Sequence, residues 1–223
     1  FGANGNSDSV RISDNGRYIV FESAATNLWP PDIGGPRDIF VYDMQDHSFE
    51  NITDWHNTNI QFSDILDDGR YVVFESNSTN LVAGDTNGKW DIFLYDRQTN
   101  VMKGVTISGN NDSNNPTISA NGRYVEFYSL STNLVSWDIN GVNDVFIYDR
   151  ILDIITSPSS KTNVSWVSSP AYSSMSADGR FLPMTFGGQA YIYNSTIEQC
   201  DDGNWVDDDA CSNSCSFNTP SCP

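Results

Sequence analysis

An internal repeat of 53 residues constrains this 223-residue chain more than any other feature of its sequence. The tripeptide Gly-Arg-Tyr begins at Gly16, Gly69 and Gly122, and the pair Asn-Leu recurs at the same step. A fourth copy begins at Gly179, 57 residues after the third, and its middle loop is shorter by 12 residues. Such periodicity is typical of repeat architectures, in which each unit buries its apolar face against a neighbouring unit.

Each unit is expected to contain four short strands rich in β-branched and aromatic residues. In the first unit the expected strands are Val10–Ser13, Tyr18–Ser23, Ile39–Asp43 and Ser48–Thr53. An Asn-Gly or Asp-Gly pair lies between the first two strands of every unit, and this pair favours a tight hairpin because glycine tolerates a positive φ. No segment shows an apolar period of 3.6 residues. The sequence therefore predicts an all-β fold, a small β-propeller of four four-stranded blades.

Three segments, ISDNGRYIVFES, DDGRYVVFESNSTNLVAGDTNGKWDIFLYD and ISANGRYVEFYSLSTNLVSWDINGVNDVFIYD, resemble the TolB-type β-propeller repeat of secreted bacterial proteins. The resemblance covers about residues 8–196. It implies a propeller domain over residues 1–196 with units at about 8–59, 60–114, 115–169 and 170–196. The fourth copy lacks the middle Asn-Leu loop, and Asn194 stands where the other units have Asp43, Asp96 and Asp149.

A separate cysteine-rich acidic tail is expected over residues 197–223. All the cysteines lie in it, namely Cys200, Cys211, Cys215 and Cys222. Cysteines clustered in this way predict two intrachain disulfides in an oxidising compartment, with their pairing left open. The segment EQCDDGNWVDDDACSNSCSF resembles the myxococcal-type cysteine-rich repeat over about residues 198–217, without that family's usual upstream cysteine.

The chain is strongly acidic, with 29 acidic against 11 basic residues and a net charge of −18. This charge disfavours binding to nucleic acids and anionic lipids and favours cations. The sequence contains no run of 18 apolar residues, so no membrane span is predicted. The chain begins without an initiator Met, so we expect either a removed signal peptide or a start within a longer protein. An extracellular or cell-surface location is predicted, and five sequons are candidate glycosylation sites: Asn51, Asn77, Asn111, Asn163 and Asn194.

Two loops, 85–91 and 138–144, share the pattern D-x-N-G-x-x-D, whose oxygen-bearing side chains around a tight glycine turn can converge on Ca²⁺. The alternative is a hairpin connection in which Asp and Asn bond their own backbone. The candidate ligands in these loops are Asp85, Asn87, Asp91, Asp138, Asn140 and Asp144. The first unit keeps the two end aspartates, Asp32 and Asp38, and the tail offers Asp202, Asn204, Asp207 and Asp209.

One arginine recurs in each unit, at Arg17, Arg70, Arg123 and Arg180. Recurrence favours a structural contact with the Tyr-Asp pair of the third strand over an anion-binding channel. The two histidines, His47 and His56, fall at unrelated repeat positions, and no nucleophile elbow, P-loop or zinc-protease motif occurs. The acidic residues would allow a glycosidase with paired carboxylates, but no motif singles out two of them as a catalytic pair, so an enzyme is not expected.

The composition and the repeat together predict a non-enzymatic, calcium-binding structural protein that assembles into an extracellular layer or fibre. Copies of the chain are the expected partners, joined head to tail by strand addition at open edges. The alternative function is a glycan- or protein-recognition module of a secreted enzyme. Loop tryptophans suit such a surface, although they equally cover blade edges: Trp29, Trp55, Trp90, Trp137, Trp166 and Trp205.

Overall fold

A computed structural model describes residues 2–29, 37–53, 59–158, 175–186 and 189–194, and its regular elements are all β-strands. Three sheets have four antiparallel strands each, and the fourth is a two-stranded hairpin over the described residues. The strands are β1 (Ser7–Ile12), β2 (Tyr18–Ser23), β3 (Asp38–Asp43), β4 (Ser48–Asn51), β5 (Ile60–Ile65), β6 (Tyr71–Ser76), β7 (Asp91–Asp96), β8 (Val101–Gly104), β9 (Ser113–Ile118), β10 (Tyr124–Ser129), β11 (Asp144–Asp149), β12 (Ile154–Thr156), β13 (Phe181–Phe186) and β14 (Gln189–Asn194).

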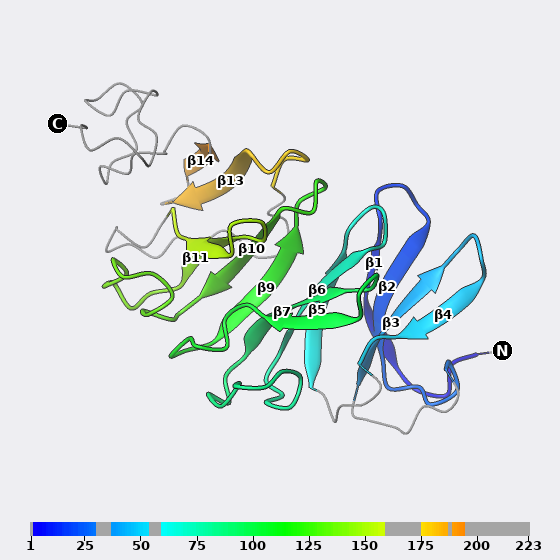
Figure 1. The fold of residues 1–223 in the computed structure, drawn as a ribbon. Helices are drawn as coiled ribbons and strands as arrows, with labels where there is room; N and C mark the ends of the chain where they lie inside the picture. The colour runs from blue at the N-terminus through cyan, green and yellow to red at the C-terminus, as the bar shows by residue number, and fades with distance from the viewer. Residues whose placement is uncertain (1, 30–36, 54–58, 159–174, 187–188, 195–223) are drawn as a thin grey trace.

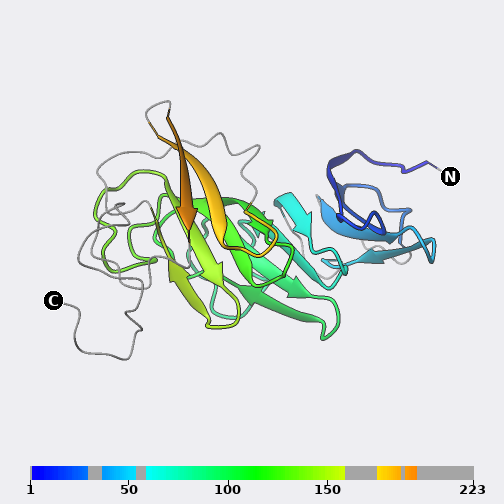
Figure 2. The same ribbon diagram turned by 90° about the horizontal axis from the view of Figure 1, so that it is seen from above.

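The sheets lie side by side as the blades of a small β-propeller (Figure 1). Within each four-stranded sheet, consecutive strands pair with one another. The first strands of neighbouring sheets meet, since β1 contacts β5 and β5 contacts β9. The first sheet and the β13–β14 hairpin lie at opposite ends of the array, as both views show (Figures 1 and 2). The prediction of an all-β propeller is confirmed.

The hairpin turns form as the Asn-Gly and Asp-Gly pairs predict. In the first unit Gly16 has a φ of +73°, and its N–H donates to the carbonyl of Ser13 at 2.8 Å. Asn15 completes the turn because its Oδ1 accepts the N–H of Arg17 at 2.8 Å. The shorter fourth unit is also confirmed, since only residues 187–188 separate β13 from β14 where residues 24–37 separate β2 from β3.

The first strand begins at Ser7, three residues before the expected start at Val10. A β-bulge explains the difference, because the pairing with β2 shifts register between Asp8 and Arg11. Ser9, at the bulge, has a φ of +52°. Such a bulge interrupts the alternation of inward and outward side chains on which the strand prediction depends. Equivalent bulges occur one and two repeats later, at Phe62 and Asn115.

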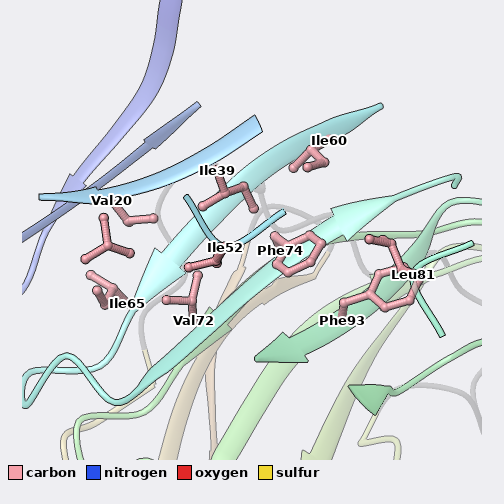
Figure 3. Close-up of a cluster of buried hydrophobic side chains, with 10 residues drawn as sticks. Val20, Ile39, Ile52, Ile60, Ile65, Val72, Phe74, Leu81 and Phe93 are labelled. Atoms are coloured by element: carbon pink, nitrogen blue, oxygen red, sulfur yellow. The ribbon is translucent and has the colours of Figure 1, made fainter. Parts of the chain in front are cut away.

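Apolar clusters between neighbouring sheets form the core. The cluster between the first two sheets joins side chains from both, as Figure 3 shows for Val20 and Ile39 facing Val72 and Phe74. A second cluster joins the second and third sheets, and a third joins β10 and β11 to Leu182 and Tyr193 of the last hairpin. Each sheet is therefore held by the faces of its neighbours.

Substitutions of two turn glycines can test this packing. Gly69 and Gly16 have the same φ of +73° but different surroundings. A Cβ on Gly69 would lie 2.4 Å from the Tyr18 ring, whereas one on Gly16 would meet nothing within 4 Å. We predict that Gly16→Ala lowers the free energy of unfolding by about 1 kcal/mol through the positive φ alone. Gly69→Ala should lower it by roughly 1–3 kcal/mol more, because the Tyr18 ring must move. Urea unfolding measures both, and equal losses would contradict the packing.

Candidate functional site

The 85–91 loop connects β6 to β7 and is held by the side chain of Asn87. Its Oδ1 accepts the N–H of Lys89 at 2.7 Å, and its Nδ2 donates to the carbonyls of Ile107 and Gly109, both at 3.2 Å. Gly88 supplies the positive φ of the turn, +63°. Asn87 therefore bonds its own backbone, as the hairpin alternative predicts, and it also ties the loop to the segment that leads to the next sheet.

The two aspartates at the ends of this loop are buried. Asp85 is 5% exposed and Asp91, the first residue of β7, is 0% exposed. One oxygen of Asp91 accepts the hydroxyl of Thr106 at 2.7 Å. Within the described residues, the other oxygen of Asp91 and both oxygens of Asp85 accept no hydrogen bond of normal geometry. Three carboxylate oxygens are thus buried without a hydrogen bond of normal geometry among these residues, and the backbone N–H and amide of Asn87 are nearby donors.

Burial raises the pKa of both carboxyl groups. For Asp91 burial raises the pKa to about 6; hydrogen bonding to Thr106 and Asn87 opposes this rise, and the charges of Asp85 and Asp112 add a smaller increase. For Asp85 burial is also the leading cause, opposed by the backbone N–H of Asn87. With a pKa of about 6, Asp91 is mostly ionised at neutral pH.

The 138–144 loop repeats this arrangement in the third sheet. Asn140 Oδ1 accepts the N–H of Val142 at 2.9 Å, and Gly141 has a φ of +64°. Asp138 and Asp144 are 5% and 0% exposed, and burial raises the pKa of Asp138. Asp138 differs from Asp85 because one of its oxygens accepts the N–H of Asn140 at 3.3 Å. The two intact loops therefore share their fold and the burial of their aspartates.

Most of the other candidate metal ligands lie outside the described residues. In the first unit Asp38 is buried and accepts the Thr53 hydroxyl at 2.8 Å, whereas its expected partner Asp32 lies outside the described residues. The tail candidates and all four cysteines also lie outside them: Asp202, Asn204, Asp207, Asp209, Cys200, Cys211, Cys215 and Cys222. No group of three or more His, Cys, Asp or Glu side chains arranged to hold a metal occurs in the described part of the chain.

Of the candidate glycosylation sites, Asn51 has its Nδ2, the atom that a glycan would join, buried without a hydrogen-bond partner among the described residues. Asn77 and Asn111 are half-buried, Asn194 ends β14, and Asn163 lies outside the description. Trp29 and Trp137 are 39% and 40% exposed, and Trp90 is half-buried. Trp55, Trp166 and Trp205 lie outside the described residues. No described helix is long and apolar enough to cross a membrane.

The recurring arginines form structural ion pairs with the aspartate that ends the third strand. The pairs are Arg17–Asp43 at 2.7 Å, Arg70–Asp96 at 2.8 Å and Arg123–Asp149 at 2.7 Å. Hydrogen bonding to Arg70 lowers the pKa of Asp96 to about 2. Each of these guanidinium groups also lies over the ring of the following tyrosine. The structural interpretation of the arginines is confirmed for these three units.

His47 has a structural explanation as well. It adopts a φ of +52° in the turn after β3, as Asn100 and Asp153 do one and two repeats later. His, Asn and Asp tolerate this left-handed region better than most residues. The side chain at this position bonds the hydroxyl of a tyrosine in the preceding strand, at 3.0 Å in all three units. His56 lies outside the described residues.

Three buried glutamates were not identified from the sequence, namely Glu22, Glu75 and Glu126. Glu22 and Glu75 occupy the same repeat position inside otherwise apolar strands, and both are 0–2% exposed. Glu75 accepts the backbone N–H of Asn115, at the bulge of β9 in the next sheet. Glu22 lies near the N–H of Phe62 at the equivalent bulge of β5. A glutamate repeated at one position of an apolar strand is the signal that could have identified Glu22 and Glu75.

Comparison with solved structures identifies the fold as TolB-like. TolB from Acinetobacter baumannii is similar with a TM-score of 0.54 and 17% identity over 86% of this chain and 41% of that chain. A TolB-type protein from Agrobacterium tumefaciens gives 0.53 and 14% over 82% and 55%. A prolyl endopeptidase gives 0.48 and 12% over 81% and 24%.

The chain therefore spans about half or less of the length of the TolB proteins that it resembles. No protein-family model matches the sequence, and no curated protein does. At these identities the similarity to the TolB proteins establishes the fold alone. The chain has a TolB-like β-propeller fold.

The buried Glu75 predicts an unusual pH dependence of stability. Burial raises its pKa from 4.5 to about 7, and the charge of Glu22 adds to the shift. At a pH between 4.5 and about 7, Glu75 holds a proton in the folded protein that it has released in the unfolded chain. The free energy of unfolding should therefore fall as the pH rises from about 4.5 to about 7. Asp91 adds a fall that ends near pH 6.

The variant Glu75→Gln keeps an acceptor for the Asn115 N–H and removes the charge. We expect its free energy of unfolding to fall less than that of the wild type between about pH 4.5 and 7, and to exceed that of the wild type at pH 8. The exposed Asp14→Asn serves as the control and should keep the fall that comes from Glu75, because the charge of Asp14 acts on Asp64 and not on Glu75. Urea unfolding at intervals between pH 4 and 8 measures this, and identical wild-type and Glu75→Gln profiles would contradict the prediction.

Proposed function

We propose that the chain is a non-enzymatic, calcium-binding structural β-propeller of an extracellular assembly. The observation that carries the proposal is the pair of buried aspartates in the 85–91 loop. Buried carboxylates in proteins are paired with cations, hydrogen-bonded or bound to metals. Here three of the four oxygens of Asp85 and Asp91 accept no hydrogen bond of normal geometry from the described residues. A bound cation would complete this site.

Calcium is the cation that the donor set favours. The donors are carboxylate oxygens, and Ca²⁺ takes six to eight oxygen ligands in flexible geometry, including backbone carbonyls and water. Zinc prefers nitrogen and sulfur ligands, and no such side chain belongs to this loop. Since only two carboxylates contribute, we expect a dissociation constant in the range of extracellular modules, about 10⁻⁴–10⁻³ M. Such a site is filled outside the cell, where Ca²⁺ is abundant, which fits the proposed location.

The proposed role of calcium is structural, because of where the loop is anchored. Asn87 binds the carbonyls of Ile107 and Gly109, which belong to the connection between the second and third sheets. The backbone N–H of Trp90 also donates to Asp112 Oδ1 of that connection at 3.0 Å. An ion bound by Asp85 and Asp91 would remove the repulsion between the two carboxylates beside this connection. Calcium would thereby strengthen the junction between two blades.

Thermal unfolding with and without calcium tests the proposal. A concentration of about 5 mM Ca²⁺ should raise the free energy of unfolding by about 1–2 kcal/mol over the value in chelator, by mass action on the folded state. The increase should be larger at pH 7.5 than at pH 5, because Asp91 has a pKa of about 6 and calcium competes with its proton.

The matched variants are Asp85→Asn and the exposed Asp14→Asn. Asp85→Asn should lose most of the response to calcium and should be more stable than the wild type in chelator, because it removes a buried charge. Asp14→Asn should respond like the wild type. A wild-type midpoint that calcium leaves unchanged at pH 7.5 would refute the calcium site.

A further inference from the structure

At both ends of the blade array, apolar side chains are more exposed than their counterparts in the other described units. At one position of the third strand, each blade presents an aliphatic side chain to the next blade. Val41, Leu94 and Ile147 are 1%, 4% and 4% exposed there, whereas Ile192 of β14 is 71% exposed. Phe181 at the start of β13 is 41% exposed. We call this surface, made of Phe181, Pro183 and Ile192, the trailing face.

The first sheet has the corresponding surface at the other end of the array, where two positions are less buried although Phe40, the counterpart of Phe93, stays at 0% exposed. In the second and third sheets the residues that face the preceding blade are fully buried, as Val72 and Phe74 are at 0%. Their counterparts in the first sheet, Ile19 and Phe21, are only half-buried. Met44, just after β3, is 44% exposed. We call this surface, made of Gly16, Ile19, Phe21 and Met44, the leading face.

The turn glycines of the different units have different neighbours. A Cβ on Gly69 would meet the ring of Tyr18 in the preceding unit at 2.4 Å, and one on Gly179 would meet the ring of Tyr124 at 2.1 Å. One on Gly16 would meet nothing within 4 Å. The turns at Gly69 and Gly179 are therefore shaped to receive a tyrosine ring from the unit before them. The turn at Gly122 receives the side chain of Leu66 instead, and among the described residues no side chain lies at this place beside Gly16. The residue equivalent to these tyrosines on the trailing face is Phe181.

The leading and trailing faces both differ from the inner faces at the position of an arginine–tyrosine contact. Inside the array Arg97 lies over the ring of Tyr18 at 5.3 Å and Arg150 over the ring of Tyr71 at 4.2 Å. At the ends Met44 replaces the arginine and Phe181 replaces the tyrosine. A thioether packs well against a phenyl ring. Met44 and Phe181 are both apolar, so the two end faces are chemically complementary at this position.

We propose that the trailing face of one copy of the chain packs on the leading face of the next copy, with Phe181 over Gly16 and beside Met44. The inference rests on the proposed structural role and adds the contact through which copies join. A second copy of the chain fits these faces because the same face-to-face contact, at the same repeat positions, joins the first sheet to the second and the second to the third. Two different faces meet, so the contact is heterologous and can propagate from copy to copy.

Sedimentation velocity of the full chain over a range of concentrations, at about 0.15 M salt to screen its negative charge, tests this contact. We expect concentration-dependent association that Ile192→Asp weakens by about 100-fold, because the contact would bury an unpaired carboxylate. Met44→Asp, on the opposite face, should weaken it similarly. Ile151→Asp is the matched control, since Ile151 is 61% exposed in a hairpin turn, and it should associate like the wild type.

A mixture of Ile192→Asp and Met44→Asp distinguishes head-to-tail packing from other contacts. Each variant keeps one intact face, so the mixture should form a 1:1 dimer and nothing larger, while each variant alone stays monomeric. A dimer that Ile192→Asp abolishes and Met44→Asp leaves unchanged would overturn the proposal in favour of a symmetric contact.

A wild-type chain that is monomeric at every concentration would overturn the proposal whether or not calcium binds. If Ile192→Asp then destabilised that monomer, the trailing face would be covered from within the same chain. Calcium binding is measured separately by thermal unfolding, so a failed calcium site and a failed contact give different results.

Discussion

The burial of one sheet's apolar face by the next sheet is the interaction on which the rest of this structure depends. A four-stranded sheet of six-residue strands has too small an apolar face to be stable alone, so each unit needs its neighbours. Val72 and Phe74 of the second sheet are 0% exposed where Val20, Ile39 and Val41 of the first sheet pack on them, whereas their counterparts Ile19 and Phe21 in the first sheet are half-buried. The loops and turns are then attached to this stack and take their surroundings from it.

Carboxylates serve two physical roles in this frame. At the rim of each blade they pair with arginine in partly exposed ion pairs such as Arg70–Asp96, where water screens the charges and the net stabilisation is small. Inside the stack Glu75 binds a backbone N–H of the next blade, and Asp85 and Asp91 close a tight loop. The interior groups carry a large desolvation cost, so their protonation and any bound cation affect stability far more than the rim pairs do.

Much of the fold and part of the site could be predicted from local signals. The turn at Gly16, the short connection at residues 187–188 and the contacts of Arg17 follow from a repeated spacing and from glycine's tolerance of positive φ. The bulge at Ser9 could not be predicted, because it depends on how β1 pairs with β2. The burial of Asp85 could not either, since the D-x-N-G-x-x-D pattern is equally compatible with an exposed hairpin.

The sequence by itself determined the repeat, the four-strand unit and the hairpin chemistry, because periodicity, turn propensity and strand propensity act over a few neighbouring residues. Only the tertiary structure decided which of the repeated positions are covered. Val41 and Ile192 occupy the same position in their units, yet one is 1% and the other 71% exposed. The physical reason is that burial depends on the neighbouring sheet, whose residues lie a full repeat away, so equivalent residues experience different environments within the array and at its ends.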